Sequence, residues 1–165
     1  MAQANPRRPV EYGALDPMPY MHPVMKKNYG KWVFHSHPKP GVLYHRAEGG
    51  DEIWTVKAGT QRQLDVFTIR KLCDIADRCA EGHVRFTARS NIEFMVADQN
   101  KVEPLIHALS EAGFPIGGTA NSVSMIAHTQ GWLHCDIPGT DASGVTKALM
   151  DELHQEFIKC EMPNR

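Results

Sequence analysis

The feature that most constrains the fold is a pair of alternating segments, HVRFTA (residues 83–88) and IEFMV (92–96), joined by the polar stretch RSN. Alternation of apolar and polar residues is typical of a half-buried strand, and a short polar link between two such strands predicts a β-hairpin. One face then carries the apolar side chains Val84, Phe86, Ile92, Phe94 and Val96. The opposite face carries Arg85, Thr87 and Arg89, with Asn91, Glu93 and Met95 beside them.

The segments around this hairpin predict an α+β fold. GDEIWTVKAG (50–59) is rich in β-branched and aromatic residues, which indicates a strand that carries Lys57. Apolar residues recur at helical spacing over 66–80, with Gly82 as the stop, and over 100–112, with Gly113 as the stop. With SVSMIAH (122–128) as a last strand, the order matches a ferredoxin-like, split βαβ arrangement whose helices cover one sheet face.

Prolines set the expected domain boundaries, because seven of the eleven lie in the first 40 residues. Proline fixes φ and donates no backbone hydrogen bond, so residues 1–40 are expected to form an extended arm rather than a packed layer. The apolar side chains of this arm would be buried against a partner or against the body. Residues 41–118 would form the ferredoxin-like half-domain, and residues 119–165 would begin a further domain.

Composition excludes some classes of protein. The formal net charge of -1 supplies no general field for nucleic acid or an anionic membrane, so any anion site must be local. No apolar run approaches the roughly 20 residues that a membrane span needs, and the first residues lack a secretory core, so we expect a cytoplasmic protein. The cysteines are then thiols or metal ligands, and Cys73 and Cys79 are predicted to pack in the core.

A second group of chemically versatile residues lies in HTQGWLHCDIPGTDASG (128–144). A tryptophan, two histidines and a cysteine in a glycine-bounded loop suit the edge of a cofactor, although no second close cysteine supports zinc. His35 and His37 form an equally weak metal-ligand pair. From spacing alone, the arginine face has two interpretations, an ordinary hydrated surface and an anion-binding platform.

Four segments carry a resemblance to a known family. They are KAGTQRQLDVFTIRKLCDIADRC (57–79), GHVRFTARSNIEFMV (82–96), FPIGGTANSV (114–123) and the 128–144 loop. On these, the chain resembles the amino-terminal part of the beta subunits of dissimilatory sulfite reductase, within the sirohaem nitrite and sulfite reductase superfamily. The resemblance covers nearly everything from Gly41 onwards.

The resemblance implies a site for sirohaem, a macrocycle with several carboxylates. In this superfamily the Arg-x-Thr-x-Arg strand contacts those carboxylates, which matches Arg85, Thr87 and Arg89. An arginine can pair with a carboxylate through two parallel hydrogen bonds. The other cofactor contacts that the resemblance implies are Asn91, Lys57, Arg70 and Trp132.

The same resemblance implies an iron–sulfur centre. Cys135 matches the first of four cysteines that hold a [4Fe–4S] cluster, and the neighbouring His134 would serve the catalytic centre. Ser124 and Met125 stand where catalytic members have a substrate-binding arginine, so the cofactor held here is expected to be structural, as sirohaem or its iron-free form. The remaining cluster cysteines would follow beyond Arg165, so we expect a truncated subunit that is inactive alone.

The implied activity is the six-electron interconversion of sulfite and sulfide in an α2β2 assembly. The partners would be the alpha subunit, wrapped by the arm, and a small sulfur-carrier protein, with no nucleic acid. Two other hypotheses remain open, a ferredoxin-like module that binds single-stranded RNA and a cofactor-free scaffold. The RNA hypothesis requires aromatic side chains for base stacking, and positions 85, 87 and 89 have none.

Overall fold

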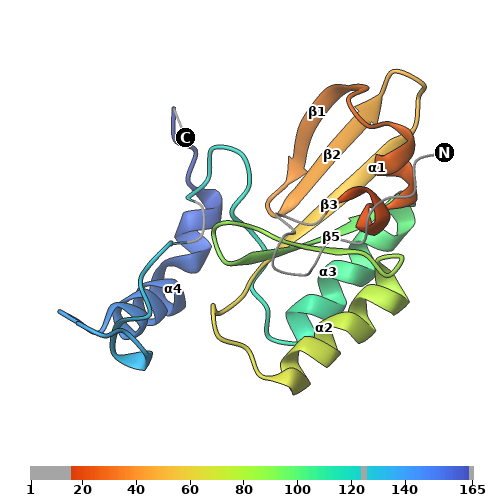
Figure 1. Ribbon diagram of the computed structural model, residues 1–165. Helices are drawn as coiled ribbons and strands as arrows, with labels where there is room; N and C mark the ends of the chain where they lie inside the picture. The colour runs from red at the N-terminus through yellow and green to blue at the C-terminus, as the bar shows by residue number, and fades with distance from the viewer. Residues whose placement is uncertain (1–15, 124–125, 164–165) are drawn as a thin grey trace.

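The computed structural model describes residues 16–123 and 126–163, and Figure 1 shows a twisted sheet with helices packed on one face. The strands are β1 (Trp32–Lys39), β2 (Val42–Ala47), β3 (Glu52–Gly59), β4 (Val84–Phe86) and β5 (Asn91–Val96). The α-helices are α1 (Pro23–Lys27), α2 (Val66–Cys79), α3 (Val102–Glu111) and α4 (Ala142–Lys159). Short 3₁₀ turns lie at Met18–Tyr20, Gln99–Lys101 and Gly131–Leu133. Among the described residues, no helix is both long and apolar enough to span a bilayer.

The five strands form one antiparallel sheet in the order β1-β2-β3-β5-β4. Strands β3, β5 and β4, with α2 and α3 as the connecting helices, reproduce the split βαβ arrangement, which confirms the predicted α+β, ferredoxin-like fold. The β1–β2 hairpin extends the sheet beyond β3. The sheet therefore has one edge at β1 and the other at β4.

Two expectations about the ends of this domain are wrong. Strand β1 pairs with β2, so residues 32–39 belong to the sheet rather than to an arm, and the boundary expected at residue 40 falls inside a hairpin. The described residues of 122–128 form no strand, and Ser124 and Met125 lie outside the described residues. Beside β3 the sheet instead has β2, and Ile116 makes a single bridge with Ala58.

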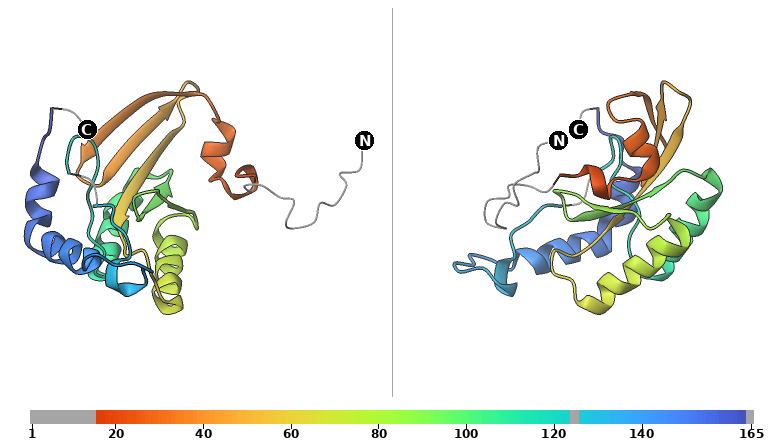
Figure 2. Two further views of the ribbon diagram at one scale, coloured as in Figure 1. Left: turned by 60° about the vertical axis from the view of Figure 1, so that its left-hand side comes forward. Right: turned by 45° about the vertical axis from the view of Figure 1, so that its right-hand side comes forward.

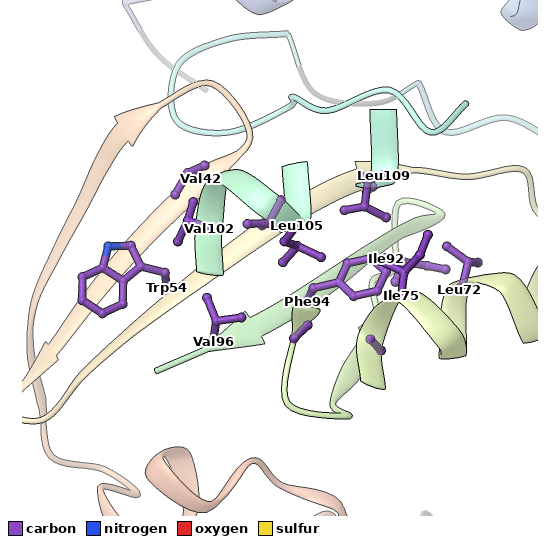
Figure 3. Packing of buried hydrophobic residues seen from close by; sticks show 14 residues of the cluster. Val42, Trp54, Leu72, Ile75, Ile92, Phe94, Val96, Val102, Leu105 and Leu109 are labelled. Carbon is purple, nitrogen blue, oxygen red and sulfur yellow. The ribbon is translucent and has the colours of Figure 1, made fainter. Parts of the chain in front are cut away.

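The core lies between the sheet and the two helices, as Figure 3 shows. Alternate residues of the central strands point toward α2 and α3, because successive side chains of a strand face opposite sides. The main participants are Val56, Ala58, Ile92, Phe94 and Val96 from the sheet, with Leu72, Ile75, Val102, Leu105 and Leu109 from the helices.

The apolar residues of β4 and one predicted core cysteine are not part of this core. Val84 and Phe86 are 37% and 67% exposed, because β4 is a three-residue strand at the edge of the sheet. Cys73 is exposed and Cys79 is half-buried, since Cys73 follows Leu72 and so falls off the buried stripe of α2. The predicted core positions of Val84, Phe86 and Cys73 are therefore wrong.

The predicted helix stops are confirmed, and they fix where the hairpin and the last segment begin. The N–H of Gly82, at φ 74, donates to the carbonyl of Ala76 over 3.0 Å. After α3, Gly113 has φ 87 and the N–H of Phe114 donates to the carbonyl of Leu109 over 3.0 Å. Both arrangements satisfy carbonyls that the last helical turn leaves unpaired.

The N-terminal segment is attached to the body through His22, which is 2% exposed. Its Nδ1 accepts from the N–H of Val24 at 3.2 Å, so Nε2 carries the proton and donates to Glu81 over 2.7 Å. Glu81 also accepts from the N–H of Ala97 and from Lys101. These contacts hold α1 against the segments that precede β4 and follow β5.

Segment 114–123 crosses the end of the sheet at Gly41, and this crossing yields a stability prediction. Gly41 has φ +78, and a Cβ there would lie 2.9 Å from the N of Gly117 and against the Ile116 side chain. We expect Gly41→Ala to lower the free energy of unfolding by about 1–3 kcal/mol, because it adds backbone strain and a clash. Urea titration measures this change.

Gly49 is the matched control, because a Cβ there meets nothing within 4 Å and its φ is ordinary. Gly49→Ala should change the free energy of unfolding by no more than about 0.5 kcal/mol. Equal losses for the two variants would contradict the role assigned to Gly41.

Candidate functional site

A depression of about 410 Å³ lies on the sheet face opposite α2 and α3. Lys57 and Glu93 are neighbours on β3 and β5, and Arg85 is opposite Glu93 on β4. These positions alternate with the core positions, so their side chains point away from the helices. The lining residues are Lys57, Arg85, Thr87, Ala88, Arg89, Asn91 and Glu93.

The three residues of the Arg-x-Thr-x-Arg pattern reach this depression by different routes. Arg85 lies on β4, but the strand ends at Phe86, so Thr87 and Arg89 belong to the turn. The Thr87 hydroxyl accepts from the backbone N–H groups of Arg89 at 3.3 Å and Asn91 at 3.2 Å, which folds the turn back. The prediction that all three share one strand face is wrong, although all three line the same depression.

A buried carboxylate lies at the floor of the depression. Glu93 is 3% exposed, and its Oε2 accepts from Arg85 Nε at 2.8 Å and from a terminal nitrogen of the same guanidinium. Its Oε1 lies 3.3 Å from Lys57 Nζ, which also donates to the carbonyl of Gly118 over 3.4 Å. Burial of these charges is tolerable because they are paired. By formal charge, Lys57, Arg85 and Arg89 still exceed Glu93 by two.

Asn91 adds an unsatisfied acceptor to this site. It is 1% exposed, and its Oδ1 has no hydrogen-bond partner among the described residues. A second depression of about 310 Å³, on the far side of the turn, shares Thr87 and Asn91 with the first. A buried acceptor without a donor is uncommon in proteins.

Two histidines occupy the same sheet face farther toward β1. His35 and His45 are cross-strand partners whose Nδ1 atoms lie 2.6 Å apart. Burial is the main cause that lowers the pKa of His45 to about 4, and the neighbouring His35 and Arg85 lower this pKa further. His45 is therefore neutral at pH 7 and adds no charge to the face.

The pKa of His45 predicts a pH dependence. Its folded value of about 4 is below the ordinary 6.5, so the unfolded chain binds the proton more readily. The stability from the neutral imidazole is thus fully present above about pH 6.5 and is lost as the pH falls toward 4. An NMR titration of the imidazole C–H protons, with His45→Gln to assign the signal, should give a midpoint near 4. A midpoint near 6.5 would refute this assignment.

The other predicted site residues lie elsewhere. Arg70 is exposed on α2 and does not line the depression. Trp132 is 69% exposed in the 3₁₀ turn Gly131–Leu133, and His134 and Cys135 follow it, with the Cys135 thiol exposed. Figure 1 shows α4 to the left of the sheet, apart from α2 and α3, and Figure 2 gives two further views of this arrangement. Within residues 16–123 and 126–163, no three histidine, cysteine or acidic side chains gather as a metal site.

The fold and site define the class of this protein. Residues 45–112 match the model of the nitrite/sulfite reductase ferredoxin-like half domain. The crystal structure of dissimilatory sulfite reductase I shares this fold, with a TM-score of 0.72 at 12% sequence identity, over 82% of this chain and 35% of that chain.

The relatives are more specific than the class. The chain is 49% identical over 150 residues to the dissimilatory-type sulfite reductase beta subunit of Archaeoglobus fulgidus. The aligned region covers 87% of this chain. It is 44% identical over 171 residues to the beta subunits of Nitratidesulfovibrio vulgaris and Megalodesulfovibrio gigas, which cover 96% of it. The chain is thus a relative of dissimilatory sulfite reductase beta subunits. It spans 41%, 45% and 65% of the length of these three relatives, respectively.

Proposed function

We propose that the depression on the open sheet face binds the carboxylates of sirohaem, or of its iron-free form. The observation that carries this proposal is the convergence of Lys57, Arg85 and Arg89 from two strands and a turn into one depression. Guanidinium groups recognise carboxylates through paired, charge-assisted hydrogen bonds, and the ammonium adds a compact positive charge.

Each residue of the site has a distinct role in this proposal. Arg85 and Arg89 bind carboxylates, while the Thr87 hydroxyl holds the turn that carries Arg89. Asn91 lines the same depression, and its side-chain amide can donate a hydrogen bond to a carboxylate through Nδ2. The charge and donor chemistry of the depression therefore fit a polycarboxylate. Arg70, exposed on α2, would contact the same group only at its periphery.

The overall reaction proposed for the assembled enzyme is the six-electron interconversion of sulfite and sulfide. When bound, the sirohaem and [4Fe–4S] pair supplies the electron-transfer chemistry, at a centre shared with the alpha subunit. This chain would contribute Cys135 as one cluster thiolate, His134 near the centre, and Trp132 as a bulky wall over the structural cofactor. One thiolate does not fit a cluster by itself, so we expect this 165-residue chain to be inactive alone.

The proposed assembly is α2β2, working with a small sulfur-carrier protein. Support for a protein partner comes from exposed apolar side chains near the N-terminal end of the described chain. Tyr20, Tyr29, Val33 and Phe34 are each more than half exposed. Exposed apolar surface is typical of interaction sites. We propose that the alpha subunit covers them.

Absorption spectroscopy tests the proposed function. The purified chain is mixed with sirohaem, passed through a desalting column and examined in the visible range. Retained sirohaem bands that scale with protein are the expected result. A colourless protein would contradict the proposal and favour the RNA-binding or scaffold hypotheses. A parallel assay with sulfite and a reduced electron donor should show no turnover by this chain.

A further inference from the structure

The buried carboxylate of Glu93 has no role in carboxylate binding as described so far. It is the acidic member of the depression, yet an anion-binding site gains nothing electrostatically from a negative charge. Glu93 lies in the middle of β5, with a cation directly opposite on each neighbouring strand. This placement requires an explanation.

The contacts divide the carboxylate between the two cations. Oε1 pairs with Lys57, and Oε2 accepts hydrogen bonds from Nε and one terminal nitrogen of Arg85. A guanidinium has five N–H donors in a rigid plane. Because one edge of the Arg85 group is bound to Glu93, its other terminal nitrogen remains for a ligand. The Arg85 side chain lines the depression and is 54% exposed, so part of it is accessible to a ligand.

We propose that Glu93 is the positioning residue of this site, holding Arg85 and Lys57 in the orientation that a bound carboxylate requires. This inference rests on the proposed function for the identity of the ligand. An untethered arginine samples many rotamers, so ordering it on binding costs conformational entropy. Glu93 orders the guanidinium before the ligand arrives. Supporting residues hold binding groups in position in the same way in other preorganised sites.

Glu93 also repels an anionic ligand, but this repulsion should affect binding less than the loss of its two ion pairs would. Lys57 is 7% exposed, and Glu93 is the one carboxylate that pairs with it among the described residues. Removing Glu93 therefore leaves the buried Lys57 ammonium without its carboxylate partner and Arg85 without its tether. Both cations then lose the orientation that Glu93 fixes, and we expect this loss to outweigh the removal of one negative charge.

The test compares Glu93→Gln with the matched control Glu103→Gln in the full chain. Glu103 is on α3, 74% exposed, and pairs with Lys39 away from the depression. The probe is citrate, a simple polycarboxylate, titrated while the Nε–H signal of Arg85 is followed by ¹H–¹⁵N NMR. In the free protein this signal should be slow to exchange in the wild type and in Glu103→Gln. In Glu93→Gln, the chemical shift of this signal should move to the value that exposed arginines have.

Citrate binding should weaken about tenfold in Glu93→Gln, which corresponds to about 1.4 kcal/mol. Glu103→Gln should change it less than twofold, and Glu93→Asp, which keeps the charge, should recover part of the affinity. Urea titration of each variant separates these effects from unfolding. Citrate binding that is equal or tighter in folded Glu93→Gln would overturn the proposal, and so would a wild-type Arg85 signal that citrate does not move. A wild-type chain that binds citrate in this way but does not retain sirohaem would support the role of Glu93 and refute the proposed ligand.

Discussion

Replacing both Arg85 and Arg89 by alanine should weaken sirohaem binding by about a hundredfold or more. Each guanidinium supplies hydrogen bonds to a charged group, and such bonds are worth about 1.5–3 kcal/mol each. Two of them lost together amount to about 3–6 kcal/mol, and every 1.4 kcal/mol is about tenfold in affinity. Both side chains line the depression, so their removal leaves Lys57 as the one cation among the described residues that line it. Absorption titration with sirohaem measures the change.

The control for this prediction removes two arginines that do not line the depression, Arg46 on β2 and Arg78 on α2. Both residues are exposed, and the charge change is the same. The double variant Arg46→Ala with Arg78→Ala should bind sirohaem as the wild type does. Similar weakening in both double variants would show that net charge, rather than the depression, governs binding.

Phe94→Ala should lower the free energy of unfolding by about 3–5 kcal/mol, the usual cost of truncating a buried phenylalanine. Phe94 is fully buried at the centre of the cluster in Figure 3, between β5 and the two helices. A cavity forms there because the surrounding side chains come from three different elements and relax only in part. Urea or thermal unfolding followed by circular dichroism measures the loss.

Phe67→Ala provides the comparison, since Phe67 lies on α2 and is 78% exposed. Its replacement should change the free energy of unfolding by no more than about 0.5 kcal/mol. A small loss for Phe94→Ala, similar to that for Phe67→Ala, would mean that the core is not where Figure 3 places it.

Much of the fold follows from local patterns. Helical spacing located α2 and α3, and the stops at Gly82 and Gly113 are confirmed by their positive φ values. The failures share one cause. Alternation predicts which side chains lie on the same face of a strand, but it does not predict whether another element packs on that face. Val84 and Phe86 alternate as core residues do, yet β4 is an edge strand beyond the helix layer. The proline content of residues 1–40 also led to the wrong prediction for β1. Its Pro38 lies on an edge strand, where the missing backbone N–H donor is tolerated.

The site was predicted in outline. Arg85, Thr87, Arg89, Asn91 and Lys57 were expected to lie together, and all five line one depression. The part played by Glu93 was missed, although its cross-strand position opposite Lys57 and Arg85 was the available signal. The roles proposed for Arg70, Trp132, His134 and Cys135 rest on the family resemblance, because these residues lie outside the depression.

The amino-acid sequence by itself determined which side chains face the helices and which face the open side of the sheet, because strand and helix periodicities are local. It therefore located the cationic face and most of the buried residues. Only the tertiary structure decided that Glu93 is shared between Lys57 and Arg85, and that Thr87 and Arg89 reach the site from a turn. Both results depend on strand register and on the path of the chain after Phe86, which pair residues from β3, β4 and β5. Such pairings arise from packing between distant segments, and local periodicity does not encode them.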